Sequence, residues 1–228
     1  AAELIDLSQQ SDFWDRHFIQ TADMDFKPDG FTGSWPDDAG TIDWDNVDGG
    51  DSEGFSPIGS GDSGGIPFSG AYDGQGHAVE NLYINRPTQD FVGLFGYVEA
   101  SSSQPALIQN IALIDSVVEG DSDVGALIGK MINYVTVEQA SVSGPLSTVE
   151  GTSGVGGLIG DPSRNTNLLN SFSTAAVLET DSTNSSDVGG LVGRFFHDRT
   201  TPVYFRNNYA APRNMDVSDG ALAGSLTD

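Results

Sequence analysis

An aspartate-rich stretch near the N-terminus is the first place where residue types and spacing could do chemistry. It holds four candidate ligands for a hard cation: Asp43, Asp45, Asp48 and Asp51. Oxygen ligands at this spacing suit calcium. The stretch is not an EF-hand, because a loop that starts at Asp43 puts Val47 at a ligand position and lacks the glutamate at its twelfth position. Calcium is therefore the one cofactor that the sequence predicts, and a solvated acidic loop over residues 43–53 is the alternative. The smaller acidic clusters at residues 121–123 and 181–187 are expected to be turn residues.

A second candidate site consists of four side chains that each follow a recurring glycine: Tyr97, Lys130, Asp161 and Arg194. If the segments that carry them stack, these side chains form one column with Asp161 between the two cations. One interpretation is a charged ligand surface that grips a carboxylated sugar. The other is a salt-bridge ladder that relieves electrostatic strain in an acidic protein.

Evidence for catalysis is weak. Residues 61–65 spell Gly-Asp-Ser-Gly-Gly, as around the nucleophile of chymotrypsin-like proteases, but His17 and His77 are expected in a cap and in a turn rather than beside that serine. A polysaccharide lyase or hydrolase would need paired carboxylates, or Arg or Lys beside metal-binding Asp. No coil shows two or three acids at neighbouring positions of the same strand. We therefore expect no enzymatic activity, with a polysaccharide-degrading protein as the alternative.

Composition restricts the partners. The 228 residues include 33 acidic and 9 basic side chains, a formal charge of −24, and no cysteine. Such a surface repels the phosphates of nucleic acids and anionic lipids, and no apolar stretch approaches the length that spans a bilayer. We therefore expect neither nucleic acid binding nor membrane insertion. Without cysteine, the chain has no disulfide bond.

An internal repeat decides the fold class. A Val-Gly-x-Leu-x-Gly pattern recurs at Val124, Val155 and Val188, and a shorter copy, Val-Gly-Leu-Phe-Gly, begins at Val92. The four valines are 32, 31 and 33 positions apart, and a worn copy covers residues 220–224. Each period holds about three short β segments joined by Gly, Ser, Asn and Asp turns, without a helical pattern between them. This is typical of a solenoid, and the sequence predicts an all-β, right-handed parallel β-helix. A propeller or sandwich is the rival architecture.

A second series lies between the motif copies. It places an amide at one position of each coil: Asn110, Gln139, Asn170 and Asn207. We expect these amides to form an internal or corner ladder in which each side chain hydrogen-bonds its neighbours above and below. Because glutamine is one carbon longer, the coil of Gln139 should be displaced or lose one ladder bond. The motif glycines should allow either tight turning or close approach of the backbone.

The repeats resemble the GLUG motif of bacterial and archaeal extracellular proteins. The resemblance covers the four motif copies, the stretch over residues 68–85 that precedes the first copy, and the upstream elements at residues 21–25 and 55–59. It implies a β-helical segment of a secreted or surface-anchored protein, often an adhesin or a stalk. Such motifs also accompany secreted peptidases and polysaccharide-active enzymes, and no catalytic set comes with the motif.

The ends of a solenoid must be covered, because an open sheet edge pairs with other chains. A short helix over residues 8–18, with Phe13, Trp14 and Phe18 on one face, is expected to cap the first coil. This gives a cap helix within residues 1–20, first coils with an acidic insertion over 21–90, and repeats over 91–228, in one continuous domain. The last motif copy has no cap after it, which indicates either a fragment or a head-to-tail filament.

The sequence thus predicts a non-enzymatic, extracellular or cell-surface module that acts as a stalk or display surface. Its expected partners are surface glycans, other proteins, or its own subunits through the uncapped C-terminal coil. A carbohydrate-binding or carbohydrate-degrading β-helix and a self-assembling filament or surface-layer subunit are the alternatives.

Overall fold

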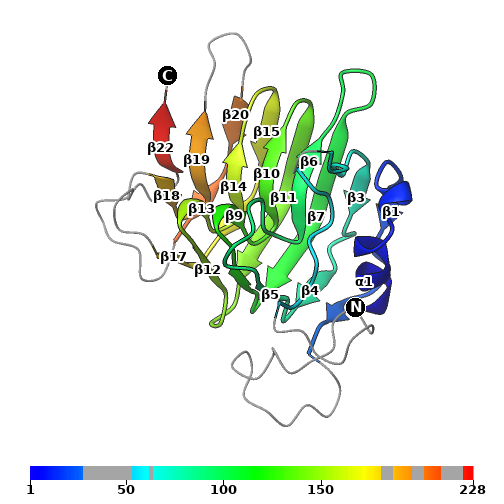
Figure 1. The fold of residues 1–228 in the computed structure, drawn as a ribbon, viewed down its shortest axis with the longest axis horizontal. Helices are drawn as coiled ribbons and strands as arrows, with labels where there is room; N and C mark the ends of the chain where they lie inside the picture. Colours follow the sequence, from blue (N-terminus) through cyan, green and yellow to red (C-terminus); the bar gives the residue numbers. More distant parts are fainter. Residues whose placement is uncertain (28–52, 62–63, 181–186, 197–202, 212–222, 228) are drawn as a thin grey trace.

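Short strands stacked in parallel register build the body of the chain. The computed structural model describes residues 1–27, 53–61, 64–180, 187–196, 203–211 and 223–227 (Figure 1). Every strand pair in these residues is parallel, and each turn of the chain adds one strand to each of several sheets. The predicted parallel β-helix is confirmed.

Four sheets run along the stack. The largest contains β1 (His17–Ile19), β2 (Met24–Asp25), β3 (Ala71–Asp73), β4 (Ala78–Glu80), β7 (Ala106–Ile114), β11 (Val135–Ser143), β15 (Thr166–Leu169), β16 (Phe172–Ser173), β20 (Val203–Arg206) and β21 (Tyr209–Ala210). The second contains β6 (Phe95–Glu99), β10 (Ile128–Ile132), β14 (Ile159–Pro162), β19 (Val192–Phe196) and β22 (Ala223–Thr227). The third contains β5 (Tyr83–Asn85), β8 (Val117–Glu119), β12 (Thr148–Gly151) and β17 (Ala176–Glu179). The fourth contains β9 (Ser122–Gly125), β13 (Ser153–Gly156) and β18 (Val188–Gly189).

The repeat motif sets the register of the coils. Val155 pairs with Val124 on one side and with Val188 on the other, and Val92 is bridged to Val124. All four valines are buried. Because equivalent residues stack directly, the period in the sequence becomes a column in the core, and the branched apolar side chains of successive coils pack on one another.

The last glycine of each motif copy is needed for close approach rather than for turning. Gly129, Gly160 and Gly193 have no left-handed φ. A Cβ atom at Gly160 would lie 2.5 Å from the backbone of Asp123 and Val124 in the preceding coil. The strand after each motif therefore crosses directly over the backbone of the coil before it, where only glycine fits.

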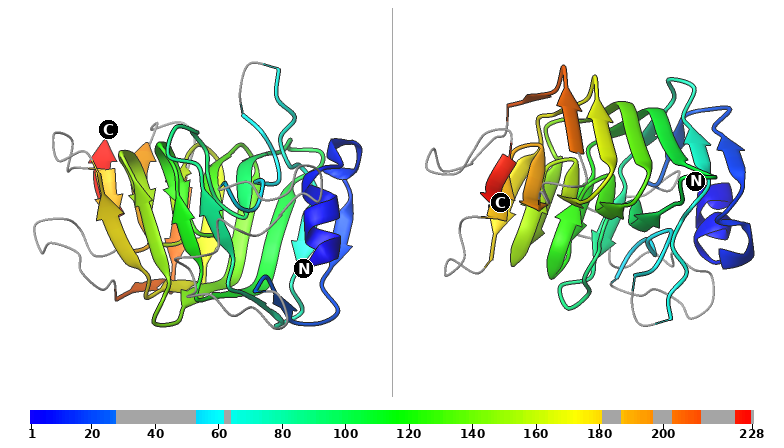
Figure 2. Two further views of the ribbon diagram at one scale, coloured as in Figure 1. Left: turned by 60° about the horizontal axis from the view of Figure 1, so that its bottom comes forward. Right: turned by 90° about the horizontal axis from the view of Figure 1, so that it is seen from above.

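The N-terminal segment differs from its prediction. The predicted short N-terminal helix is confirmed as α1 (Ala2–Ser8), which is followed by the 3₁₀ turn η1 (Ser11–Phe13), but its predicted bounds of residues 8–18 are wrong. His17–Ile19 instead pairs in register with β3, which satisfies its backbone groups, and the Phe18 ring lies 6.3 Å from that of Phe68. Figure 2 shows α1 beside β1 at the N-terminal end of the stack.

Tyr72 places a phenol inside the first complete coil. Its side chain is 2% exposed, and its hydroxyl donates a hydrogen bond to Gln20 Oε1 at 3.1 Å. Burial raises the pKa of Tyr72 well above its ordinary value of 10.0. The folded protein therefore keeps this proton at a pH where the unfolded chain loses it.

This proton linkage predicts lower stability in alkali. Stability is retained below about pH 10 and falls as the pH rises above it, because the folded state then binds more protons than the unfolded state. We expect the free energy of unfolding in urea to decline above pH 10 and the decline to be shallower in Tyr72→Phe. Tyr209→Phe, which removes an exposed hydroxyl, is the control. Equal slopes for Tyr72→Phe and the parent would contradict the assignment.

Candidate functional site

The predicted column of four side chains exists. Lys130 on β10 is in register with Tyr97 on one side and with Asp161 on the other. The pairing of β14 with β19 places Arg194 next to Asp161 in the following coil. Counting from the last glycine of each motif copy was enough to locate these positions, even though the copy at Val92 is one residue shorter than the copy at Val124.

Lys130 is bound by two buried carboxylates. Its Nζ atom lies 2.7 Å from Asp161 Oδ2 and 3.0 Å from Asp123 Oδ2, and both carboxylate side chains are 3% exposed. Ser163 Oγ donates a further hydrogen bond of 2.7 Å to Asp161 Oδ1. The two acids thus have the charge-assisted partners that burial requires.

Asp123 belongs to this cluster although its sequence context indicated only a turn. It precedes Val124, has a left-handed φ of 54°, and points its carboxylate at the lysine instead of at solvent. The signal that could have found it is positional: the residue before each motif valine lies beside the column in every coil. The turn interpretation accounts for the left-handed backbone conformation of Asp123 but not for the contact of its side chain with Lys130.

Arg194 ties three successive coils together. Its Nη2 atom donates to Asp123 Oδ1, which lies two coils earlier, and its Nε atom lies 3.8 Å from Asp161 Oδ2. The intervening coil has Gly154 in line with Asp123, and a Cβ there would approach Asp123 Oδ1 to 2.6 Å. The glycine therefore leaves the space in which Arg194 and Asp123 meet.

Opposite charges stabilise one another within the cluster, and a third carboxylate at its edge, Asp187 Oδ2, lies 3.8 Å from Arg194 Nη1. Burial raises the pKa of Asp123, an effect that Lys130 and Arg194 oppose. Burial lowers the pKa of Lys130, but Asp161 and Asp123 outweigh it and leave that pKa above its ordinary value. Two cations and two carboxylates fix one another, which is the salt-bridge ladder of the sequence analysis in a more buried form.

A surface depression of about 410 Å³ borders the cluster, lined by Lys130, Ile132, Asp161, Ser163, Arg164 and Arg194. Three of its lining residues are cationic in a strongly acidic chain. Binding of a carboxylated sugar by this column therefore stays a prediction, and the carboxylates that already hold Lys130 and Arg194 would compete with such a ligand.

The amide series lies at surface bends. Asn110, Gln139, Asn170 and Asn207 all have left-handed φ angles between 52° and 55°. Asn207 Nδ2 donates to Asn170 Oδ1 at 2.9 Å, which is one bond of the predicted ladder. The corner position is thus confirmed, while the continuous internal ladder is wrong.

Nearby acids explain why the ladder is interrupted. Asn110 Nδ2 donates to Asp73 Oδ1 at 2.9 Å, and Asn170 Nδ2 donates to Glu138 Oε1 at 3.2 Å. Charged acceptors form stronger hydrogen bonds than neutral amides do. The Gln139 side chain has no hydrogen-bond partner within the part of the chain that the structure describes, since the neighbouring Asn110 and Asn170 amides donate to these acids instead.

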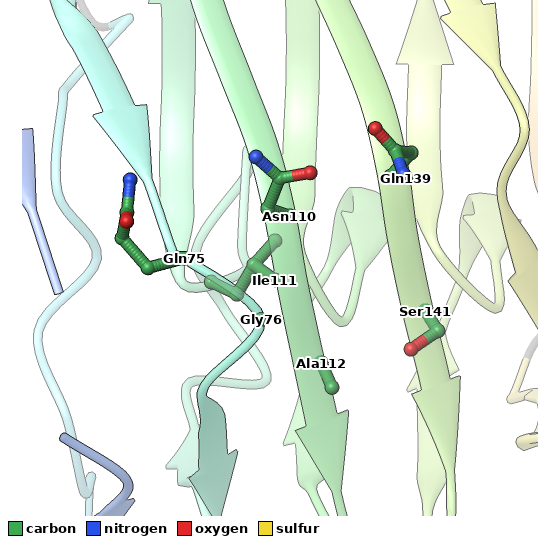
Figure 3. Close-up of a pocket in the computed structure, with 7 residues that line it drawn as sticks. All are labelled: Gln75, Gly76, Asn110, Ile111, Ala112, Gln139 and Ser141. Carbon is green, nitrogen blue, oxygen red and sulfur yellow. The ribbon is translucent and has the colours of Figure 1, made fainter. Parts of the chain in front are cut away.

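A second depression, of about 380 Å³, runs along these bends. Figure 3 shows the side chains of Gln75, Asn110 and Gln139 on successive coils along one edge of it. Gly76, Ala112 and Ser141 line its floor, where small side chains leave the sheet surface low. We call this feature the amide groove.

The remaining predicted sites are not tested by the structure. Asp43, Asp45, Asp48 and Asp51 lie outside the described residues, as does part of the Gly61–Gly65 segment. Among the described residues, no group of three His, Asp or Glu side chains could hold a metal ion. His77 Nδ1 lies 3.1 Å from Asp23 Oδ1, and His17 is exposed on β1. Within the described residues, no helix is both long and apolar enough to cross a bilayer.

Comparison with known proteins gives one partial similarity. The chain is 36% identical over 98 residues to Halomucin from Haloquadratum walsbyi, a match that covers 41% of this chain and 1% of that protein. No family model matches the sequence, and no solved structure matches the chain. The GLUG resemblance accordingly stays a prediction, and the similarity covers only a small part of Halomucin.

Proposed function

We propose that this chain is a non-enzymatic structural module of an extracellular or cell-surface protein, where it acts as a stiff spacer. The observation that carries the proposal is the unbroken parallel register of the described coils, in which each coil is fixed to the next by strand pairing. The similarity to a protein named Halomucin supports a surface location.

The corner cluster supports the same role. Its two carboxylates are paired with Lys130 and Arg194, so that neither is left free as a general base or a metal ligand. Arg194 connects side chains across three coils, which resists both sliding and peeling of one coil from another. A module of this kind holds attached segments at a fixed separation.

The spacer role is tested by measuring distances between the two ends of the stack. The chain has no cysteine of its own, so Asp12→Cys and Tyr204→Cys provide two unique spin-label positions, both exposed. We expect a single narrow distance distribution by pulsed electron resonance, unchanged between low and high salt. The same pair in denaturing urea is the control for a broad distribution. A broad or multi-peaked distribution in buffer would contradict a stiff spacer.

A further inference from the structure

The column of residues that passes through the amide groove continues, beyond the residues that line the groove, into two exposed aromatic side chains. One outward-facing column of the largest sheet runs through the groove floor in register: Ala78, Ala112, Ser141, Phe172 and Tyr209. The first three side chains are small, and the last two are aromatic and 40% and 62% exposed. Phe172 is therefore the register neighbour of Ser141, which lines the groove, and Tyr209 follows Phe172 in the next coil.

Unused hydrogen-bonding groups line the edge of the groove. The Gln139 amide has no hydrogen-bond partner among the described residues, and the Asn110 amide donates to Asp73 through Nδ2, which leaves its oxygen as an acceptor. An amide offers both donors and acceptors, as sugar hydroxyl groups do. The edge can thus bind a hydroxyl-rich ligand that lies along the coil axis.

The two segments that carry the aromatic rings contain no acidic residue, and the nearby Glu138 of the preceding coil accepts a hydrogen bond of 3.2 Å from Asn170 Nδ2. Residues 162–178 and 203–211 contain no Asp or Glu, although the chain has 33 acidic residues. Asp73, beside the groove, accepts hydrogen bonds from Asn110, Gln109 and Gln75, and these bonds lower its pKa. Both nearby carboxylates, Asp73 and Glu138, accept hydrogen bonds from amide side chains, and the overall charge of −24 repels a polyanion but not a neutral ligand.

We infer that the amide groove binds a neutral polysaccharide chain. Sugar rings stack on Phe172 and Tyr209, while their hydroxyl groups exchange hydrogen bonds with Gln139 and Asn110. The apolar face of a pyranose ring suits an exposed aromatic ring, and the narrow, polar edge beside a low floor suits a linear chain. This inference names a ligand for the module and does not depend on the spacer role.

Calorimetric titration of the whole chain with cellohexaose, laminarihexaose, maltohexaose and hexagalacturonate tests the inference. We expect at least one neutral hexasaccharide to bind, with an affinity that changes little with salt. Phe172→Ala and Gln139→Gly should each weaken it about tenfold. Glycine suits the left-handed φ of residue 139, so the second variant keeps the bend. Leu146→Ala, which removes an exposed apolar side chain that does not line the groove, is the matched control.

Three results would overturn the inference. The first is no heat of binding with any neutral hexasaccharide, including the case in which hexagalacturonate alone binds and does so less at high salt. The second is binding that both groove variants leave unchanged. The third is self-association of the chain that Phe172→Ala abolishes, because the rings would then contact another protein copy. None of these results bears on the distance distribution that tests the spacer role.

Discussion

Gly160→Ala should destabilise the chain by more than about 3 kcal/mol or prevent it from folding. The added Cβ atom would lie 2.5 Å from the backbone of Asp123, Val124 and Gly129. Backbone atoms in paired strands cannot move aside as a flexible side chain can, so two coils would have to separate where they cross. Urea unfolding followed by the circular dichroism of the strands measures the loss.

A second glycine separates crowding from backbone conformation. Gly76 has a φ of +82°, and nothing lies within 4 Å of a Cβ placed there. Gly76→Ala should therefore cost only about 1 kcal/mol, the strain of a left-handed alanine. Equal losses in free energy of unfolding for Gly160→Ala and Gly76→Ala would contradict the view that the motif glycine is required for close approach of the backbone.

The sequence was sufficient for features that repeat once per coil. Val124 and Val155 are 31 residues apart, and this spacing alone predicts that they stack, because every coil must return to the same corner. The same reasoning located Lys130 beside Asp161. The register therefore followed from the repeat, independently of any knowledge of side-chain contacts.

Features that depend on contacts within and across coils were not predictable in this way. Phe13, Trp14 and Phe18 fit a helical face, but Phe18 lies in a strand because β3 offers a complete set of backbone partners. Asp123 was interpreted as a turn residue because its charge partners are seven residues away at Lys130 and two coils away at Arg194. A one-dimensional pattern gives the position of a residue in the repeat but not the direction of its side chain.

The exposed aromatic residues beside the amide groove show the same limit. Phe172 and Tyr209 are 37 positions apart in the sequence, outside the 31 to 33 spacing of the motif, because the coil between them is longer. Only the strand pairing brings them into one column. Because of the irregular coil length, the sequence spacing does not predict that these two exposed aromatic residues are register neighbours.

Lys130→Met should lower the free energy of unfolding at neutral pH by about 3–5 kcal/mol, because it leaves buried carboxylates without their main partner. Asp123 and Asp161 would then share Arg194 alone, which lies 3.8 Å from Asp161. The methionine side chain keeps most of the volume of the lysine stem, so the loss reports charge rather than packing. Arg16→Met, at an exposed ion pair with Asp15, should change stability by less than about 0.5 kcal/mol and is the control.

The pH dependence of stability and a second substitution show whether Lys130→Met acts through lost charge pairing or through lost packing. Removing the lysine removes a cation that lowers the pKa of Asp123, so this pKa rises further above that of the unfolded chain. Near this pKa, the folded state then binds more protons than the unfolded state. The loss in free energy of unfolding of Lys130→Met relative to the parent should therefore shrink as the pH falls toward 3.8, the ordinary pKa of aspartate.

Adding Asp161→Asn to Lys130→Met should recover at least half of the loss at neutral pH, because one unpaired charge is removed while Ser163 keeps a hydrogen-bond acceptor. A deficit that is independent of pH and is not relieved by Asp161→Asn would show that Lys130 acts through packing. The cluster would then stabilise the coils through packing rather than through ion pairs between them.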